Sequence, residues 1–143
     1  MKLDNKNILI AGGTGLIGRA LIRELLSIGR TDITVASLDS PIDLPSIVKF
    51  NNLDLRTYEN CVKAVKDVDI VINLLGIKTS PKIMRERPAS IFIPYLQFNT
   101  NLMEAAVKNG VQWFLYTSSI GVYDPCTIMK EDDVWNTMPS KND

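Results

Sequence analysis

The stretch from Asn7 to Gly18, NILIAGGTGLIG, constrains the fold of this chain more than any other. A short apolar run, Ile8–Ile10, has the composition of a buried strand, and a glycine-rich turn follows it directly. From Leu16 the apolar residues take helical spacing at positions 17, 21, 25 and 28, and Gly29 ends the predicted helix. A strand, a glycine turn and a helix in succession predict the first unit of a dinucleotide-binding fold.

The glycine turn has the chemistry that phosphate binding requires. A helix N-terminus presents unpaired N–H groups and a partial positive charge of roughly half a unit. Gly12, Gly15 and Gly18 leave no Cβ between the backbone and a pyrophosphate. The spacing is GxxGxxG, and the Gly-Lys-Ser/Thr ending of a P-loop is absent, which disfavours an ATPase. A turn with a purely structural role is the alternative interpretation.

Composition excludes several classes of protein. The chain has 143 residues, enough for one domain, and its formal net charge of zero gives no reason to expect nucleic acid or an anionic membrane as a partner. The absence of histidine removes Ser-His-Asp catalysis and most zinc sites, so no metal is expected. Cys61 and Cys126 fit no metal spacing, which favours free thiols in a reducing cytoplasm. No apolar run approaches the ~20 residues of a membrane span.

Alternating strands and helices are expected along the rest of the chain. Four further strands are predicted at Ile33–Ser37, Ile47–Phe50, Ile70–Leu74 and Trp113–Thr117. After the first helix, Leu16–Ile28, two more are predicted: Thr57–Val65 with Thr57 as its N-cap, and one from Pro88 or Pro94 to Lys108. Polar connections are expected at Gly76–Arg87 and around Glu131-Asp132-Asp133. Five strands alternating with helices predict an α/β, Rossmann-type, doubly wound parallel sheet in the order 3-2-1-4-5.

Polar side chains near the strand ends suit the adenosine part of a dinucleotide. Asp39 lies about 20 residues beyond Gly18, where an acid that binds the ribose hydroxyls of NAD is expected. Ser37 is the competing alignment, and a turn at Asp39 is the structural alternative. Asp54 is a candidate acceptor for the adenine amino group or a support for the turn that follows it. Asn73 ends an otherwise apolar strand at the sheet edge where such folds bind ligands.

Four features in chain order resemble the extended short-chain dehydrogenase/reductases. They are the GGTGLIG turn, Asp54-Leu55-Arg56, Asn73-Leu74-Leu75-Gly76 and the YTSSIGVY segment. The NLMEAA segment at 101–106, and Glu131-Asp132 followed by Pro139-Ser140, are similar to the sugar-nucleotide epimerase/dehydratase branch. The resemblance covers nearly the whole chain and does not define one substrate.

The resemblance implies NAD as the cofactor, with NADP as the alternative, and gives roles to named residues. For the pyrophosphate it implies Gly12, Gly15 and Gly18, with backbone contacts from Thr14, Leu16 and Ile17. For adenine it implies Asp54 and Leu55, and for the nicotinamide ribose Leu74, Leu75 and Gly76. Ser119, four residues before Tyr123, matches the family's catalytic serine or threonine, whose hydroxyl would hydrogen-bond the sugar oxygen being oxidised.

One departure from the family is large. The family's base is the tyrosine of a Tyr-x-x-x-Lys motif, and that motif is absent here: none of Tyr58, Tyr95, Tyr116 and Tyr123 is followed by lysine at the fourth position. Pro139-Ser140 lies where the family pattern would be about to reach that tyrosine. Residues 1–143 are therefore interpreted as the NAD(P)-binding Rossmann domain of a longer enzyme, truncated before its base and its substrate-binding region.

The longer enzyme is expected to transfer a hydride at a sugar carbon of a nucleotide sugar, as an epimerase or dehydratase does. It is expected to be cytoplasmic and to form a homodimer. The alternative function is a non-catalytic NAD(P)-binding module, either a redox sensor or an assembly subunit.

Overall fold

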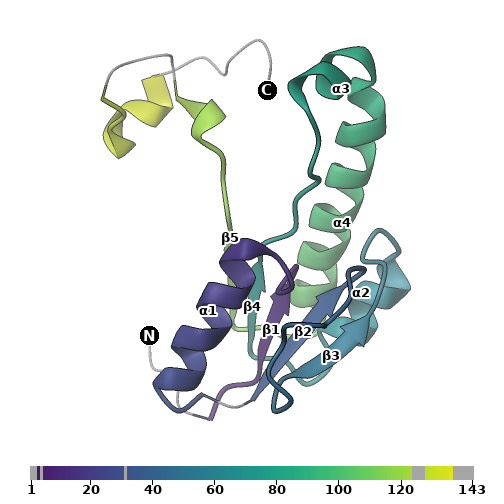
Figure 1. Ribbon diagram of the computed structural model, residues 1–143, viewed down its shortest axis with the longest axis vertical. Helices are drawn as coiled ribbons and strands as arrows, with labels where there is room; N and C mark the ends of the chain where they lie inside the picture. The colour runs from purple at the N-terminus through teal and green to yellow at the C-terminus, as the bar shows by residue number, and fades with distance from the viewer. Residues whose placement is uncertain (1–2, 4, 31, 124–127, 137–143) are drawn as a thin grey trace.

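The computed structural model describes residues 3, 5–30, 32–123 and 128–136, so Cys126 and Pro139-Ser140 lie outside the described residues. A parallel five-stranded sheet in the order β3-β2-β1-β4-β5 confirms the predicted fold class and strand order (Figure 1). The strands are β1 Ile8–Ala11, β2 Ile33–Ser37, β3 Lys49–Asn52, β4 Ile70–Asn73 and β5 Trp113–Tyr116. The helices are α1 Leu16–Ser27, α2 Tyr58–Ala64, α3 Pro81–Glu86 and α4 Pro88–Lys108, followed by short 3₁₀ turns at Ile120–Val122 and Glu131–Asn136. None of the helices within the described part of the chain is long and apolar enough to cross a membrane.

The sheet is covered on both faces, by α1 on one side and by α2 and α4 on the other (Figure 1). Alternate residues of β1 are buried in opposite cores, because side chains of a strand point to opposite faces. Ile8 and Ile10 belong to the core that includes Ile22 of α1. Leu9 belongs to the core that includes Leu102 of α4, and both side chains are fully buried.

The first helix buries a face that is shifted from the one expected. The spacing of positions 17, 21, 25 and 28 predicts one apolar stripe; Leu25 is buried and Leu21 packs partly buried against the core, but the other buried residues of α1 are Gly18 and Ile22. Ile17 and Ile28 are exposed. The helix does end as predicted: Gly29 has φ +81°, and its N–H donates to the Leu26 carbonyl at 3.0 Å.

Several predicted boundaries differ from those observed. The third strand runs over Lys49–Asn52, two residues later than Ile47–Phe50, because the edge strand is set by its register with β2, from Thr34 opposite Lys49 onward. The long helix begins at Pro88, with Pro94 inside it. Thr57 occupies the N-cap position of α2, but its hydroxyl donates to the Asp54 carbonyl instead of capping the helix.

Two segments predicted as loops contain short helices. Within Gly76–Arg87 lies α3, whose N-cap Ser80 accepts a hydrogen bond from the Ile83 N–H at 3.3 Å, with Pro81 as the first helical residue. Serine followed by proline is typical of a helix start, and the expectation of a polar connection did not take it into account. The acidic run at 131–133 begins a 3₁₀ turn.

Cys61 is a free, buried thiol whose pKa is raised to about 12, chiefly by burial.

A polar cluster joins three strands at the amino edge of the sheet. Asp69, just before β4, accepts hydrogen bonds from the Asn7 N–H (3.0 Å), the Lys6 ammonium (3.2 Å) and the Gln112 amide (2.9 Å). The Asn7 N–H and then the Lys6 side chain hold the pKa of Asp69 below its usual value.

The cluster predicts a pH-dependent contribution to stability. Because the folded pKa of Asp69 is lowered, its stabilising contribution is present above the unfolded pKa of roughly 4 and is lost as the pH falls through the folded value. Asp69→Asn should therefore be less stable than the wild type at pH 7, and the difference should shrink below about pH 4. Urea unfolding at both pH values measures this, and an equal difference at pH 7 and pH 3 would contradict it.

Candidate functional site

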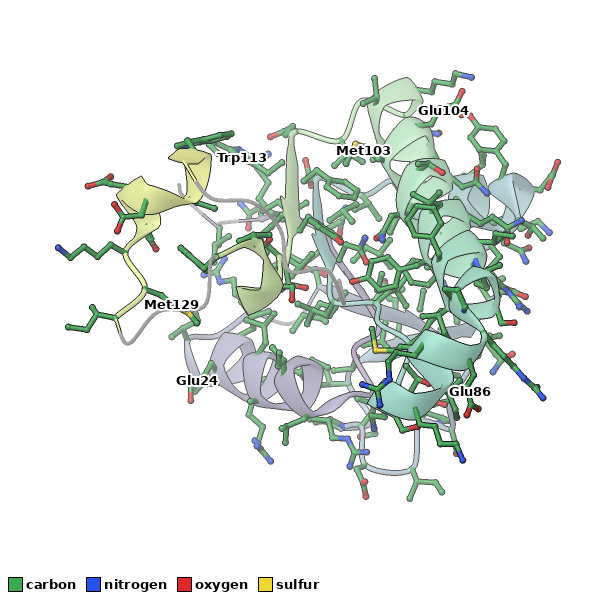
Figure 2. All side chains as sticks on the ribbon, turned by 90° about the horizontal axis from the view of Figure 1, so that it is seen from above. Glu24, Glu86, Met103, Glu104, Trp113 and Met129 are labelled. Carbon is green, nitrogen blue, oxygen red and sulfur yellow. The ribbon has the colours of Figure 1, made fainter. Side chains whose placement is uncertain are left out.

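Two adjoining hollows form one groove over the carboxyl edge of the sheet, the side from which Figure 2 is seen. The glycine-turn hollow has a volume of about 820 Å³ and lies over the turn between β1 and α1. The second hollow, of about 420 Å³, lies over the ends of β2 and β3 and beside α4. Both are lined by Ser37, Asp39, Leu75, Gly76 and Ile77. The predicted residues that line the groove are Gly12, Thr14, Gly15, Leu16, Ile17, Gly18, Asp39, Asp54, Leu55, Leu74, Leu75 and Gly76.

The glycines of the turn have different structural roles. Gly12 has φ +77°, and a Cβ there would lie 3.0 Å from the Leu74 carbonyl oxygen. A Cβ on Gly18 would lie 2.5 Å from the Gly13 Cα, so the helix can approach the turn only because both residues are glycine. Gly13, which sequence reasoning passed over, packs against Val35 in the same way. At Gly15, however, the nearest atom to an added Cβ is the Gly12 oxygen at 3.3 Å.

Gly15 is therefore the glycine that packing within the protein explains least. It is the N-cap residue of α1, has an ordinary extended conformation, and borders the glycine-turn hollow. The first N–H groups of any helix lack partners within the helix, and here they lie at the same hollow. An open surface over Gly15 beside unpaired N–H groups fits a pyrophosphate, because phosphate oxygens accept hydrogen bonds from such groups.

The end of β2 carries a hydroxyl group, not a carboxylate. Ser37, the competing alignment, is the last residue of β2, and its Oγ lies 2.8 Å from the Thr14 Oγ1 in a buried contact. Thr14 therefore turns its side chain toward β2 and offers only its backbone to the groove. Asp39 lies two residues beyond the strand, exposed, and its N–H donates to the Ser37 Oγ at 3.1 Å.

Asp54 forms hydrogen bonds with residues of its own turn and of the helix that follows it. Its carboxylate accepts hydrogen bonds from the Arg56 side chain, at 2.9 Å for Nε and 2.5 Å for Nη2, and these bonds hold the pKa of Asp54 below its usual value. Its carbonyl accepts bonds from Thr57 and from Asn60 at 3.0 Å. The turn-supporting role is thus observed directly. A contact of Asp54 with adenine stays a prediction, and Asp54 does line the second hollow together with Leu55.

Asn73 supports the groove without lining it. Its side chain is completely buried; Nδ2 donates to the Asn99 Oδ1 of α4 at 2.7 Å, and Oδ1 accepts from the Leu75 N–H at 3.1 Å. The interpretation of Asn73 as a ligand-facing residue is therefore replaced by a positioning role. It joins α4 to the Leu74-Leu75-Gly76 segment, which borders the glycine-turn hollow.

Ser119 lies apart from the groove as the structure describes it. Its Oγ accepts a hydrogen bond from the Gly121 N–H at 3.1 Å, and Ser119 is not among the described residues lining either hollow. Tyr95 of α4 does line the glycine-turn hollow, with its hydroxyl 3.5 Å from that of Tyr116. That hydroxyl contact, followed by burial, raises the pKa of Tyr95 to about 12. A base needs a lowered pKa, so Tyr95 is unsuited to replace the missing tyrosine.

Sequence reasoning also missed two cations of the glycine-turn hollow, Arg19 and Lys78. Arg19 directly follows Gly18, so its place in the first turn of α1 was a readable signal. Its Nε donates to the Thr14 carbonyl at 2.7 Å, and its Nη1 pairs with Asp43 from the connection between β2 and β3. No position-specific signal marked Lys78, which follows β4 by five residues.

The parallel sheet, its strand order and the glycine turn at its carboxyl edge define a Rossmann-type dinucleotide-binding domain. Residues 8–142 match the NAD dependent epimerase/dehydratase family, and the chain belongs to that family.

The relatives carry several different activities in their names. GDP-mannose 3,5-epimerase 1 of Oryza sativa subsp. indica is 29% identical over 144 residues, covering 95% of this chain and 38% of the relative. A 3-beta-hydroxysteroid dehydrogenase of Mycolicibacterium neoaurum is 30% identical over 131 residues, covering 85% and 34%. The solved UDP-glucose 4-epimerase of Thermus thermophilus, in complex with NAD, is 26% identical with a TM-score of 0.78, covering 94% and 45%. This chain thus spans less than half the length of each.

Proposed function

We propose that this chain is the cofactor-binding part of an NAD(P)-dependent epimerase or dehydratase that acts on a nucleotide sugar. The observation that carries the proposal is the groove over Gly15, where a helix N-terminus meets an open surface. Gly12, Gly15 and Gly18, with the backbone of Thr14, Leu16 and Ile17, would hold the pyrophosphate. The second hollow, with Asp54 and Leu55, would receive the adenosine part.

The remaining groove residues would orient the reacting end of the cofactor. Leu74, Leu75 and Gly76, held in place by Asn73, would line the nicotinamide ribose. When bound, the nicotinamide ring supplies hydride transfer to and from a sugar carbon. Ser119 would donate a hydrogen bond to the sugar oxygen being oxidised, because its present bond, in which Oγ accepts from the Gly121 N–H, does not use the hydroxyl proton. We propose that the catalytic base lies outside residues 1–143.

Two of the reported relatives support a nucleotide sugar as the substrate, since their names specify GDP-mannose and UDP-glucose. The name of the hydroxysteroid dehydrogenase specifies a steroid alcohol instead of a nucleotide sugar. Both substrate classes contain a secondary alcohol that can be oxidised. The substrate test is therefore a panel of both classes: nucleotide sugars and 3β-hydroxysteroids.

The experiment has a binding step and a turnover step. Calorimetric titration should show that residues 1–143 bind NAD or NADP, and failure to bind either would overturn the interpretation of the groove. The whole protein, incubated with the panel, should convert a nucleotide sugar, as measured by NMR of the product. Residues 1–143 alone should not. Binding without turnover by the whole protein would favour the non-catalytic module instead.

We also propose a homodimer. Two apolar side chains of α4, Met103 and Val107, are exposed, and Figure 2 shows Met103 on the β5 side of α4. Val107→Glu should weaken self-association, because it places a charge in an apolar contact, while Val107 is already 75% exposed and contributes little to the core. Light scattering over a concentration series measures the change; an unchanged molecular mass would exclude this face.

A further inference from the structure

Arg19 lies in the groove between the glycine turn and the segment that follows β2. Its Nε is fixed to the Thr14 carbonyl at 2.7 Å, within the glycine turn. Its Nη1 reaches Asp43, in the connection that follows β2. The guanidinium therefore spans the distance between the glycine turn and the segment after β2, and it lines the glycine-turn hollow together with Ser37, Asp39 and Ser40.

The residue at the end of β2 does not suit the ribose of NAD. An acid near this position accepts hydrogen bonds from the ribose hydroxyls in NAD-binding folds, and an arginine nearby accommodates the 2′-phosphate of NADP. Here the last strand residue is Ser37, only 5% exposed, with its hydroxyl bonded to Thr14 and to the Asp39 N–H. A small, uncharged side chain at this point leaves room for a phosphate and does not repel it.

We propose that Arg19 binds the 2′-phosphate of NADP and that the protein prefers NADP to NAD. This inference rests on the proposed function and names the cofactor of the same groove. Guanidinium groups bind phosphate by charge-assisted, often paired hydrogen bonds. The two contacts described for Arg19 use two of its five N–H donors, which leaves three for a ligand.

The ion pair with Asp43 does not prevent this. Both side chains are about half exposed, and exposed ion pairs contribute little, so a doubly charged phosphate displaces or joins Asp43 at small cost. The bond from Nε to the Thr14 carbonyl meanwhile keeps the guanidinium in place. Arg19 is thus pre-positioned by the turn that would hold the pyrophosphate.

Asp39 is the charge that opposes the proposal. It lines both hollows, and its carboxylate would repel a 2′-phosphate. Because Asp39 is exposed, water and salt screen this repulsion, whereas Arg19 would contact the phosphate directly. The two hypotheses differ in what Asp39→Ala should do to NAD binding. NAD binding should change little if Arg19 is the determinant, and it should weaken if Asp39 holds the ribose hydroxyls.

Calorimetric titration with four ligands tests the inference: NAD, NADP, adenosine 5′-monophosphate and adenosine 2′,5′-bisphosphate. The wild type should bind NADP more tightly than NAD, and the bisphosphate more tightly than the monophosphate. Arg19→Gln should weaken NADP and bisphosphate binding by about 10- to 100-fold and change NAD binding by less than about threefold. The matched control is Arg23→Gln, which removes the same charge from the exposed side of the next helical turn and should change neither.

The outcomes separate the inference from the proposed function. Tighter binding of NAD than of NADP would overturn the inference and leave the dinucleotide groove standing. Equal losses for both dinucleotides in Arg19→Gln would also overturn it, because they would mean that Arg19 only supports the turn. A thermal melt of each variant identifies a loss caused by unfolding, and Arg19→Lys, which keeps the charge, should then recover part of the NADP preference. Failure to bind all four ligands would overturn both proposals.

Discussion

Gly15→Asp is expected to weaken NAD(P) binding by about 100-fold or more, while leaving the protein folded and no less stable. Gly15 has φ −72° and ψ 175°, a conformation open to any residue, and an added Cβ meets only the Gly12 oxygen at 3.3 Å. Gly15 is also the N-cap of α1 and makes no side-chain cap bond, and aspartate is among the favoured N-cap residues. The same carboxylate would stand where a pyrophosphate approaches the helix, and like charges repel.

Two further variants separate the causes. Gly15→Asn has nearly the same shape and capping ability without the charge, so it should weaken binding less than Gly15→Asp. Gly18→Ala, in contrast to Gly15→Asp, should lower the stability of the protein. Its Cβ would lie 2.5 Å from the Gly13 Cα, so it should destabilise the fold by about 3 kcal/mol or more. Thermal melts and calorimetry on the three proteins measure this. If Gly15→Asp still binds either dinucleotide with wild-type affinity, the pyrophosphate does not lie over Gly15.

The sequence predicted the architecture because the strong local signals agreed with one another. The apolar strand Ile70–Asn73, the glycine turn and the Gly29 terminus each follow from short-range chemistry, and right-handed crossovers then leave one strand order. Weak signals gave the errors. Lys49–Asn52 is an exposed edge strand, so hydrogen-bond register rather than hydrophobicity sets its limits. The buried face of α1 is set by the close approach at Gly18, a packing constraint that apolar spacing does not contain.

The site was predictable as a list of groove residues, but less so in its internal bonding. The glycines, Leu74, Leu75 and Gly76 line the groove, as expected of residues at the carboxyl edge of a parallel sheet. Ser37 and Asn73 were harder, because the role of each depends on a partner distant in sequence. Thr14 turns the Ser37 hydroxyl inward, and Asn99 of α4 does the same for Asn73. Spacing within one strand does not contain such contacts.

Asn73→Ala is expected to lower the free energy of unfolding by about 2–4 kcal/mol and to weaken dinucleotide binding at the same time. The change removes two partly buried hydrogen bonds made by a fully buried side chain. It leaves the Asn99 Oδ1 and the Leu75 N–H, both of half-buried residues, without these partners, and an unpaired group costs up to about 1–3 kcal/mol where water does not reach it. Leu75 borders both hollows, so a loosened Leu75 N–H loosens the wall of the groove.

A double-mutant cycle isolates the contact between α4 and the end of β4. Asn99→Ala alone removes one side of the 2.7 Å bond, so the double variant should be less destabilised than the sum of the two single variants, by about 1 kcal/mol or more. Thr100→Ala, one residue along α4, is the matched control, because the Thr100 hydroxyl bonds only within its own helix and should show no coupling to Asn73. Additive losses at positions 73 and 99, with unchanged NAD(P) affinity, would mean that the amide pair fills space without positioning the groove. A coupled loss that also lowers affinity would establish that the packing of α4 sets the shape of the cofactor site.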